Sequence, residues 1–353
     1  MLESSIRATN VTVSPQSVPQ QLTDDHGLAE NTTYLPESVR ESLYELLDAS
    51  VAPNTRKAYM SRWRLFSTWA RTNGFQPLPA EPAVLASYIA EMSGQKRSVS
   101  TVEQSLAAIS AVHKAKGYES PTSNLIVQKT LKGYSRLHGV APHKKSAATL
   151  DVVKQMLQTA NEQVRYGELS RFAHARNCAI ITLGFAGAFR RSELSALTVD
   201  DLEWQTHNDK EILIVHLKRS KTDQTGKGLD KAIFPSENPE ICPIVLLKRW
   251  LSLARINNGP VFRRLKKNGS VTKDTLSDRS IAEIVKRMAD DAGLNLDISG
   301  HSLRRGFVTT AIRAGRSERS IMHQTGHKSA STLREYFERE SVIEDNAADG
   351  LMN

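Results

Sequence analysis

The decisive stretch of the sequence reads Gly300-His301-Ser302-Leu303-Arg304, continues through Gly326-His327, and ends in Leu333-Arg334-Glu335-Tyr336. On a helix, His301 and Arg304 are three residues apart and share a face. Each element alone is typical of a surface pair or of core packing. Together they combine a planar fork of donors for phosphate oxygens with proton carriers that work near neutral pH. Tyr336 adds a nucleophile, once its hydroxyl with a pKa near ~10 is deprotonated. The stretch therefore predicts a site that acts on a phosphodiester.

This joint pattern resembles the signature of the tyrosine recombinase (phage integrase) family: Arg, Lys, His-x-x-Arg, His or Trp, then Tyr. The upstream arginine lies in Phe189-Arg190-Arg191-Ser192-Glu193-Leu194, where the Arg-x-x-Glu register selects Arg190 and leaves Arg191 as its neighbour. Glu193, one turn later, is expected to orient Arg190. In the family the lysine lies on a β-hairpin. Ser220-Lys221-Thr222 matches that position, with Lys218 and Lys227 as weaker candidates.

Charge is unevenly distributed along the 353 residues, whose net charge is +9. Residues 1–50 hold two Arg, no Lys and eight Asp or Glu, a net charge of −6, so the remaining residues carry +15. A basic body behind an acidic leader indicates a polyanionic partner, most simply nucleic acid. No apolar run approaches the ~20 residues that cross a membrane, and the first residues do not resemble a signal peptide. Cys178 and Cys242 cannot form a metal site alone and indicate a reducing compartment.

The pattern of caps and apolar residues predicts an acidic, polar leader at 1–35, which we expect to be disordered. A helical domain follows at 36–138, then a linker at 139–148. Within the helical domain, Ser38 and Glu41 form a capping box, Asn54 begins a long helix, and Pro82 begins another. Ser100 with Glu103 is expected to cap the next helix, and a last one is expected from about Ser123 to Leu137.

A second domain is expected at 149–340, with a tail at 341–353. Thr149 is expected to cap its first helix, and an apolar helix leads from Arg176 to the Arg190 motif. Residues 211–218 are a strand by composition, and 231–234 are expected to return beside them as a hairpin. The tail carries Val342, Ile343, Leu351 and Met352 between acidic residues and is too short for a core of its own.

The resemblance covers residues 36–353 and is nearest to the Cre-like members of the family. It implies two domains: an all-α core-binding domain (a SAM-like helical bundle) and a mixed α+β catalytic domain, mostly helical with a small antiparallel sheet. It implies cleavage and rejoining of duplex DNA through a 3′-phosphotyrosine and a Holliday junction, without metal, nucleotide or other cofactor. The roles are nucleophile for Tyr336, phosphate donors for Arg190, Arg304 and His327, base for His301, and acid for Lys221.

The partners implied are duplex DNA with inverted-repeat half-sites around a spacer and further copies of the chain. These copies would form a dimer on one site and a tetramer at synapsis, with the tail docked on a neighbouring protomer. No membrane is involved, and the location implied is cytoplasmic, nucleoid-associated and bacterial or phage-encoded. The candidate DNA contacts are Lys57, Arg62, Gln104, Lys144, Lys145, Arg263, Lys266, Lys267 and Arg279. The position of Arg279 reads a guanine in Cre-like enzymes.

Two departures from the Cre-like pattern limit what can be carried over. His327 stands where those enzymes have Trp, although His is the commoner residue in the wider family. Ser100 stands where they have a DNA-contacting lysine, so no target specificity is inferred. Two alternatives remain open: a type IB topoisomerase-like enzyme that relaxes DNA, and a catalytically idle DNA-binding relative. The filled set of six catalytic positions disfavours the idle relative.

Overall fold

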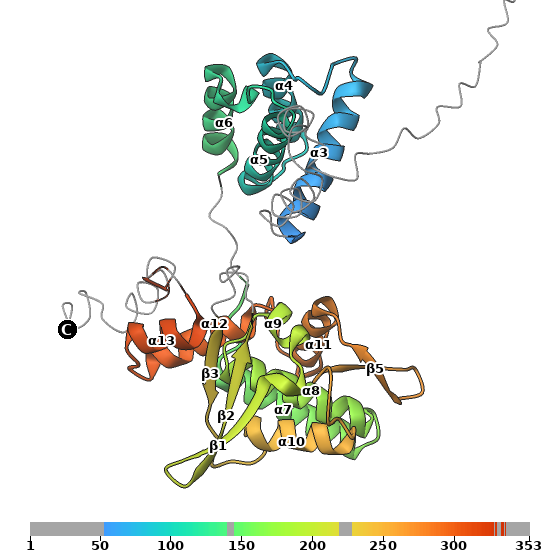
Figure 1. Cartoon of the computed structure of the whole chain (residues 1–353), viewed down its shortest axis with the longest axis vertical. Coiled ribbons are helices and arrows are strands. Elements are labelled where there is room, and N and C mark those ends of the chain that lie inside the picture. Colours follow the sequence, from blue (N-terminus) through green and yellow to red (C-terminus); the bar gives the residue numbers. More distant parts are fainter. Residues whose placement is uncertain are drawn as a thin grey trace, which may run out of the picture. The chain divides into compact units, whose positions relative to one another are not determined.

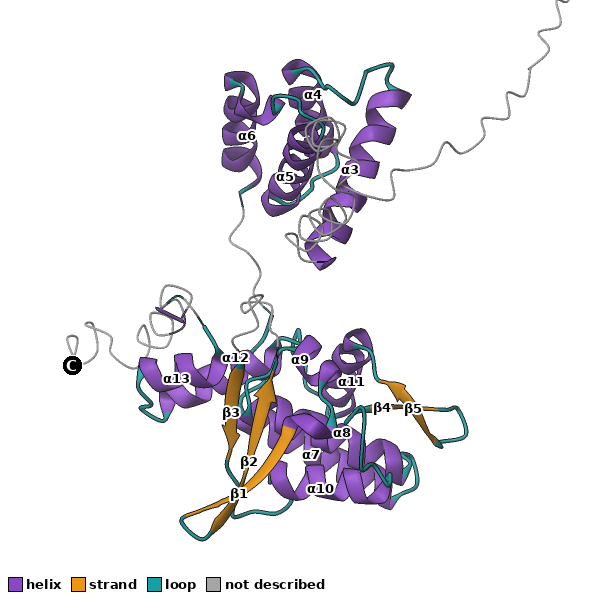
Figure 2. Cartoon of the chain, viewed as in Figure 1, coloured by secondary structure: helices purple, strands orange, loops and turns teal. Residues whose placement is uncertain are grey.

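The computed structural model describes residues 53–139, 145–218, 228–327, 329, 333, 334 and 336. The chain divides into two compact units, residues 1–142 and 143–353. Figure 1 follows the chain by colour, and Figure 2 separates helices from strands. The described residues are mostly helical, with small antiparallel sheets in the second unit only. The leader at 1–35, the Ser38–Glu41 box and the tail at 341–353 lie outside the described residues.

The first unit is a helical bundle over its described residues. Its elements are α3 (Pro53–Thr72), α4 (Pro82–Gly94), α5 (Val99–Ala115), the 3₁₀ turn η1 (Pro121–Ser123) and α6 (Leu125–His138). Helix α3 packs on α5, and α4 packs on α6. The aromatic stripe of α3 lies in the core, where the buried ring of Phe66 meets Tyr88 of α4 with 5.2 Å between ring centroids. This apolar contact fixes which face of α3 remains available to a partner.

Helix starts in this unit follow local capping chemistry. Pro82 occupies the first turn of α4, as expected. The expected cap at Ser100 is wrong. Ser98 caps α5 instead, with its hydroxyl accepting a hydrogen bond from the amide of Thr101 at 3.2 Å. Both serines have a polar residue three positions later, but the chain turns extended at Ser98, which makes Ser98 the residue that satisfies the free amide.

His113 is a buried hydrogen-bonding residue that joins α5 to the start of α4. Its Nε2 accepts from the amide of Ala80 at 2.8 Å, and Nδ1 lies 2.8 Å from the carbonyl oxygen of Ile109. Because Nε2 accepts, the ring is neutral with its proton on Nδ1. Burial lowers the pKa of His113, and the hydrogen bond to Ile109 opposes this shift. The unfolded chain therefore binds this proton more readily than the folded chain does.

We expect the first unit to be fully stabilised above the unfolded pKa of about 6.5 and to lose stability as the pH falls below it. Hydrogen exchange at Ala80, corrected for its intrinsic pH dependence, is the measurement. His113→Phe is expected to cost about 1–3 kcal/mol and to flatten the pH dependence, because it removes both hydrogen bonds and the titration. His323→Ala, at an exposed position on α13, is the control and is expected to keep the wild-type profile. Protection at Ala80 that does not change with pH in the wild type would contradict the assignment.

The second unit surrounds the long apolar helix α8 (Arg171–Ala186), whose middle is buried on all sides. The other helices are α7 (Leu150–Arg165), α9 (Arg191–Ala196), α10 (Pro243–Leu253), α11 (Asp278–Asp291), α12 (Ser302–Arg313) and α13 (Glu318–Thr325), with the 3₁₀ turn η2 at Val199–Asp201. Helices α7, α10, α11 and α12 all pack against α8 (Figure 1). The site residues at the ends of α8 and on α12 are therefore carried by one rigid core.

Over the described residues of this unit, five strands form two antiparallel sheets (Figure 2). The strands are β1 (Leu202–His207), β2 (Lys210–Leu217), β3 (Leu229–Ile233), β4 (Arg263–Leu265) and β5 (Val271–Thr275). Strands β2 and β3 pair as the expected hairpin, with Leu213 opposite Ile233. The connection between them, 219–227, lies outside the described residues. Strand β1 and the β4–β5 hairpin were not predicted.

The second half of the expected linker packs on the second unit. The amide of Ser146 donates to the carbonyl of Asp297, and the amide of Ala148 donates to the carbonyl of Ser302, each at 2.9 Å. Ala148 is fully buried. A Cβ on Gly306 of α12 would lie 1.7 Å from the carbonyl oxygen of Ala148, so only glycine permits this approach.

Among the described helices, none combines the length and apolarity needed to span a bilayer.

Candidate active site

Arg190 lies at the junction between α8 and α9, where its extended backbone forms the N-cap of α9. Its guanidinium Nη1 lies 2.6 Å from Oε1 of Glu193, and its own amide donates to Oε2 of the same carboxylate at 2.9 Å. Glu193 is 5% exposed. One buried carboxylate therefore fixes both the backbone and the side chain of Arg190, as the Arg-x-x-Glu spacing predicts.

Arg304 is 2% exposed, on the first turn of α12. Its Nη1 donates to the carbonyl oxygen of Ala188 at 3.0 Å. Its buried Nη2 has no hydrogen-bond partner among the described residues. The pKa of Arg304 is lowered to about 10, mainly by burial and also by Arg190, while Glu193 and Tyr336 oppose the shift. The guanidinium remains charged at neutral pH and keeps one buried donor that has no partner among the described residues.

His301 and His327 approach the same centre from two elements. His301 is the exposed N-cap residue of α12. His327 follows Gly326, whose left-handed backbone ends α13 at φ 67°. The pKa of His327 is lowered to about 4, mainly by burial and also by the charges of Arg304, Arg190, His301 and Lys231. His327 is therefore neutral at pH 7, with Nδ1 2.9 Å from the hydroxyl oxygen of Thr325.

Tyr336 is helical and half-buried, and its ring packs beside the small apolar cluster of Val308, Ala311, Ile321 and Leu333. The guanidinium carbon of Arg305 lies 5.4 Å from the centre of the tyrosine ring. Tyr336 also influences the pKa of Arg304. Five of the six predicted catalytic residues are thus neighbours: Arg190, His301, Arg304, His327 and Tyr336. Lys221 lies outside the described residues.

The structure adds a residue to this centre that the motif did not predict, Lys231 of β3. Its side chain is 0% exposed, and its Nζ lies 3.9 Å from Oε2 of Glu193. The pKa of Lys231 is lowered to about 7, mainly by burial; Glu193 opposes this shift, and Arg304 and Arg190 add to it. The period of two along β3 could have located it, because Lys231 and Ile233 share the inward face of the strand. A lysine on a strand is ordinarily exposed to solvent, so the residue type alone does not indicate that Lys231 is buried at this centre.

The candidate DNA contacts differ in their surroundings. Lys57, Gln104, Lys266, Lys267 and Arg279 are exposed, and Arg62 is half-buried. Lys145 forms an ion pair with Asp297 at 2.6 Å. The guanidinium of Arg263 donates to the carbonyls of Pro260 and Asn258 in its own loop. Arg279 pairs with Glu283 at 2.9 Å, with its side chain 86% exposed. Lys144 lies outside the described residues.

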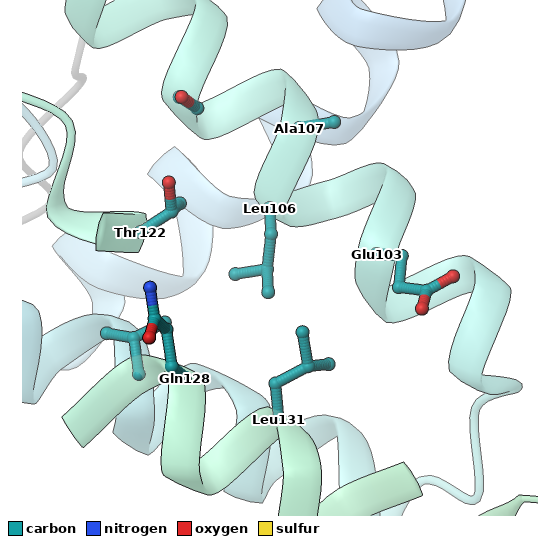
Figure 3. A pocket seen from close by; sticks show the side chains of 8 residues that line it. Glu103, Leu106, Ala107, Thr122, Gln128 and Leu131 are labelled. Atoms are coloured by element: carbon teal, nitrogen blue, oxygen red, sulfur yellow. The ribbon is translucent and has the colours of Figure 1, made fainter. Parts of the chain in front are cut away.

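A pocket in the first unit offers no competing chemistry. Leu106 of α5 and Leu131 of α6 point into it, and Glu103 is the one ionisable side chain among its eight lining residues (Figure 3). Within the described parts of the chain, no group of three or more His, Cys, Asp or Glu side chains could hold a metal ion. The concentration of buried charge around Arg304 therefore remains the candidate site.

A two-domain chain with a cationic, tyrosine-bearing centre on a helical scaffold defines a phosphoryl-transfer enzyme of the tyrosine recombinase type. Residues 147–341 match the model of the phage integrase family, which is more than half of the chain. The protein therefore belongs to the phage integrase family of tyrosine recombinases.

Similar proteins agree with this membership. The chain is 35% identical over 311 residues to an integrase/recombinase xerD homolog of Selenomonas ruminantium, covering 87% of this chain and 88% of the relative. It is 23% identical over 323 residues to recombinase Cre of Escherichia phage P1, covering 85% and 89%.

Two solved structures share the fold. One is the XerH site-specific recombinase bound to a palindromic difH substrate, with a TM-score of 0.57, 20% identity, and coverage of 77% of this chain and 73% of that one. The other is a lambda integrase dimer bound to a COC′ core site, with a TM-score of 0.55, 14% identity, and coverage of 85% and 75%.

Proposed function

We propose that this enzyme carries out site-specific recombination by attack of Tyr336 on a DNA phosphodiester at the cationic centre. One observation supports this most directly: buried Arg304 has an unpartnered Nη2, beside Arg190 and Lys231. The pKa values of Arg304, Lys231 and His327 are all lowered, most strongly by burial, and neighbouring positive charges contribute to the lowering of each. An anion placed among them relieves both penalties, because it pairs the unused donor and offsets the repulsion.

The proposed reaction has three parts: attack by the nucleophile, stabilisation of the negative charge on the phosphate, and departure of the 5′-oxygen. The hydroxyl oxygen of Tyr336 bonds to phosphorus, its proton passes to His301, and the bond from phosphorus to the 5′-oxygen breaks. Arg190 and Arg304 bind the non-bridging oxygens as negative charge builds on them, each contributing roughly 10²–10³ in rate by analogy with oxyanion donors. His327 binds the same oxygens. Lys221 delivers a proton to the departing 5′-oxygen.

The product of this step is a 3′-phosphotyrosine and a free 5′-hydroxyl. The phosphotyrosine keeps the energy of the broken bond, so a 5′-hydroxyl from a second duplex can reverse the reaction and join the strands. Exchange of both strands in turn passes through a Holliday junction. The target we propose is a pair of inverted half-sites around a spacer, bound Cre-like by two protomers and synapsed by four, with the tail at 341–353 joining neighbouring protomers. The relatives named as recombinases support strand exchange between DNA molecules as the activity.

Selection of bound sites from random DNA, followed by recombination between two copies of the selected site, tests the proposal. We expect inverted repeats to emerge and two copies to recombine in the presence of EDTA. Relaxation of supercoiled DNA without any need for the selected site would instead indicate the type IB topoisomerase-like activity. Binding with neither recombination nor relaxation would indicate an idle relative.

Arg279 is expected to read sequence, because it begins α11 with an exposed guanidinium. A bidentate arginine–guanine contact contributes roughly 1–3 kcal/mol of discrimination. Arg279→Ala is therefore expected to relax the preference at one base pair per half-site. Lys266→Ala and Lys267→Ala are the matched controls, and they are expected to weaken binding to all sequences alike and to reduce the salt dependence. Binding to the selected site and its single-base variants measures both effects, and uniform weakening by Arg279→Ala would make it a phosphate contact.

A further inference from the structure

Lys231 contacts a single backbone turn, the residues that join α8 to α9. Its Nζ donates to the carbonyl oxygen of Gly187 at 2.7 Å and lies 3.4 Å from that of Ala188. The same nitrogen is 4.7 Å from the ring centre of Phe189. One buried ammonium group thus contacts all three residues that immediately precede Arg190.

This turn has a conformation that the chain does not adopt without support. Ala188 has φ 46°, in the left-handed region that residues other than glycine rarely adopt. Such a residue costs on the order of 1–3 kcal/mol and persists only when its surroundings hold it. A Cβ on Gly187 would lie 2.1 Å from the ring of Phe189, so the turn is also closely packed. Lys231 and Arg304 are the side chains that hold its carbonyls.

The turn connects Lys231 to both arginines of the centre. Arg304 donates to the carbonyl of Ala188, which also lies within reach of Lys231. Arg190 follows Phe189 directly, and its partner Glu193 lies 3.9 Å from the lysine nitrogen. A shift of the turn would therefore move the start of α9, which carries Arg190, and remove the acceptor that orients Arg304.

We propose that Lys231 is a positioning residue, which holds the turn 187–189 so that Arg190 and Arg304 are directed together at the phosphate. The inference rests on the proposed phosphoryl-transfer function. Lys231 acts through the arginines rather than on the substrate, because its side chain is 0% exposed and its nitrogen is bound to backbone carbonyls. A phosphate between the arginines also favours the charged form of Lys231, which keeps all three of its donors.

The test compares Lys231→Met with Lys248→Met, a control that removes an exposed lysine in an ion pair with Glu211 on the same unit. Methionine keeps the length and fills the buried space without a donor. We expect Lys231→Met to slow single-turnover cleavage by roughly 10–100-fold, a fraction of an oxyanion-donor effect. DNA affinity and cooperative unfolding are expected to stay near wild type, and Lys248→Met is expected to cleave at the wild-type rate.

A double-mutant cycle then separates positioning from an independent role. If Lys231 acts through Arg304, Lys231→Met is expected to slow the Arg304→Ala variant by less than about threefold, because residues in one network are not additive. Lys231→Arg, which keeps the charge and the donors, is expected to restore most of the rate. If the methionine variant does not unfold cooperatively, the same double-mutant cycle is measured with Lys231→Gln, whose shorter side chain keeps a hydrogen-bond donor.

Wild-type cleavage by Lys231→Met, or full additivity with Arg304→Ala, would overturn the inference. Selective rescue of Lys231→Met by a substrate with sulfur at the 5′-bridging position would also overturn it, because that result makes Lys231 a proton donor. Failure of the proposed function is a different outcome: the wild-type protein itself would then form no covalent adduct with DNA.

Discussion

Tyr336→Phe is expected to form no covalent adduct with DNA, while it binds the selected site about as tightly as the wild type. The change removes one oxygen and leaves the ring, which packs beside Arg305 and the apolar cluster at the end of α12. Losing the nucleophile removes the chemical step itself, so the expected loss in cleavage is about 10⁴-fold or more. Denaturing electrophoresis of a labelled strand, with EDTA present, measures the adduct directly.

Tyr166→Phe is the matched control, because Tyr166 is an exposed tyrosine of the same unit, with 75% of its surface accessible. It is expected to form adducts at the wild-type rate. Tyr134 is a weaker alternative as nucleophile, since it is 4% exposed and its hydroxyl donates to the carbonyl of Arg97. If an adduct persists in Tyr336→Phe but is lost in Tyr166→Phe or in Tyr134→Phe, the tyrosine replaced in that variant is the nucleophile.

The candidate site residues stand in short sequence motifs, whereas much of the scaffold depends on contacts between distant residues. Arg190, His301, Arg304, His327 and Tyr336 were located by their resemblance to the motifs of the family, and their catalytic roles stay predictions. Helix existence follows from apolar periodicity where one face is buried, as in α3, whose aromatic stripe lies in the core. Family membership and the mostly helical fold are confirmed. The exact cap of α5 was wrong because two serines compete within three positions.

Features that depend on distant contacts were not predictable. Strand β1 is exposed at four of its six positions and alternates only over its first residues, so its pairing with β2 is what identifies it. From the sequence alone, Lys231 would be taken for a surface residue, because its burial depends on the packing of β3 against the turn at 187–189. From the sequence alone, Arg263 would be taken for a basic residue available to DNA, yet its guanidinium donates to the carbonyl of Pro260. Its role in binding DNA, and those of the other candidate contacts, stay predictions.

Lys221 is the residue expected to protonate the departing 5′-oxygen. Expelling an alkoxide is slow without a proton, and general acid catalysis typically contributes about 10²–10⁴ in rate. A substrate with sulfur in place of that oxygen expels a thiolate, whose conjugate acid has a pKa near ~8.5. Lys221→Ala is expected to cleave the ordinary substrate slowly and the sulfur substrate near the wild-type rate. Single-turnover cleavage of the two substrates measures this rescue.

Two other lysines around the hairpin are less suited to the role. Lys218 pairs with Asp201 at 3.0 Å, and this hydrogen bond raises the pKa of Lys218, which makes it a weaker acid. Lys231 is fully buried against backbone carbonyls. Lys227, like Lys221, lies outside the described residues and is tested beside it.

Arg190→Ala distinguishes proton delivery from charge stabilisation in the same experiment. The arginine binds non-bridging oxygens, so its contribution is retained when the leaving atom changes, and sulfur is expected to restore little of its rate. Lys218→Ala is expected to cleave both substrates close to the wild-type rates, because its charge is already committed to Asp201. Rescue of Lys218→Ala or Lys227→Ala, with none for Lys221→Ala, would shift the hairpin register and move the acid to the rescued position.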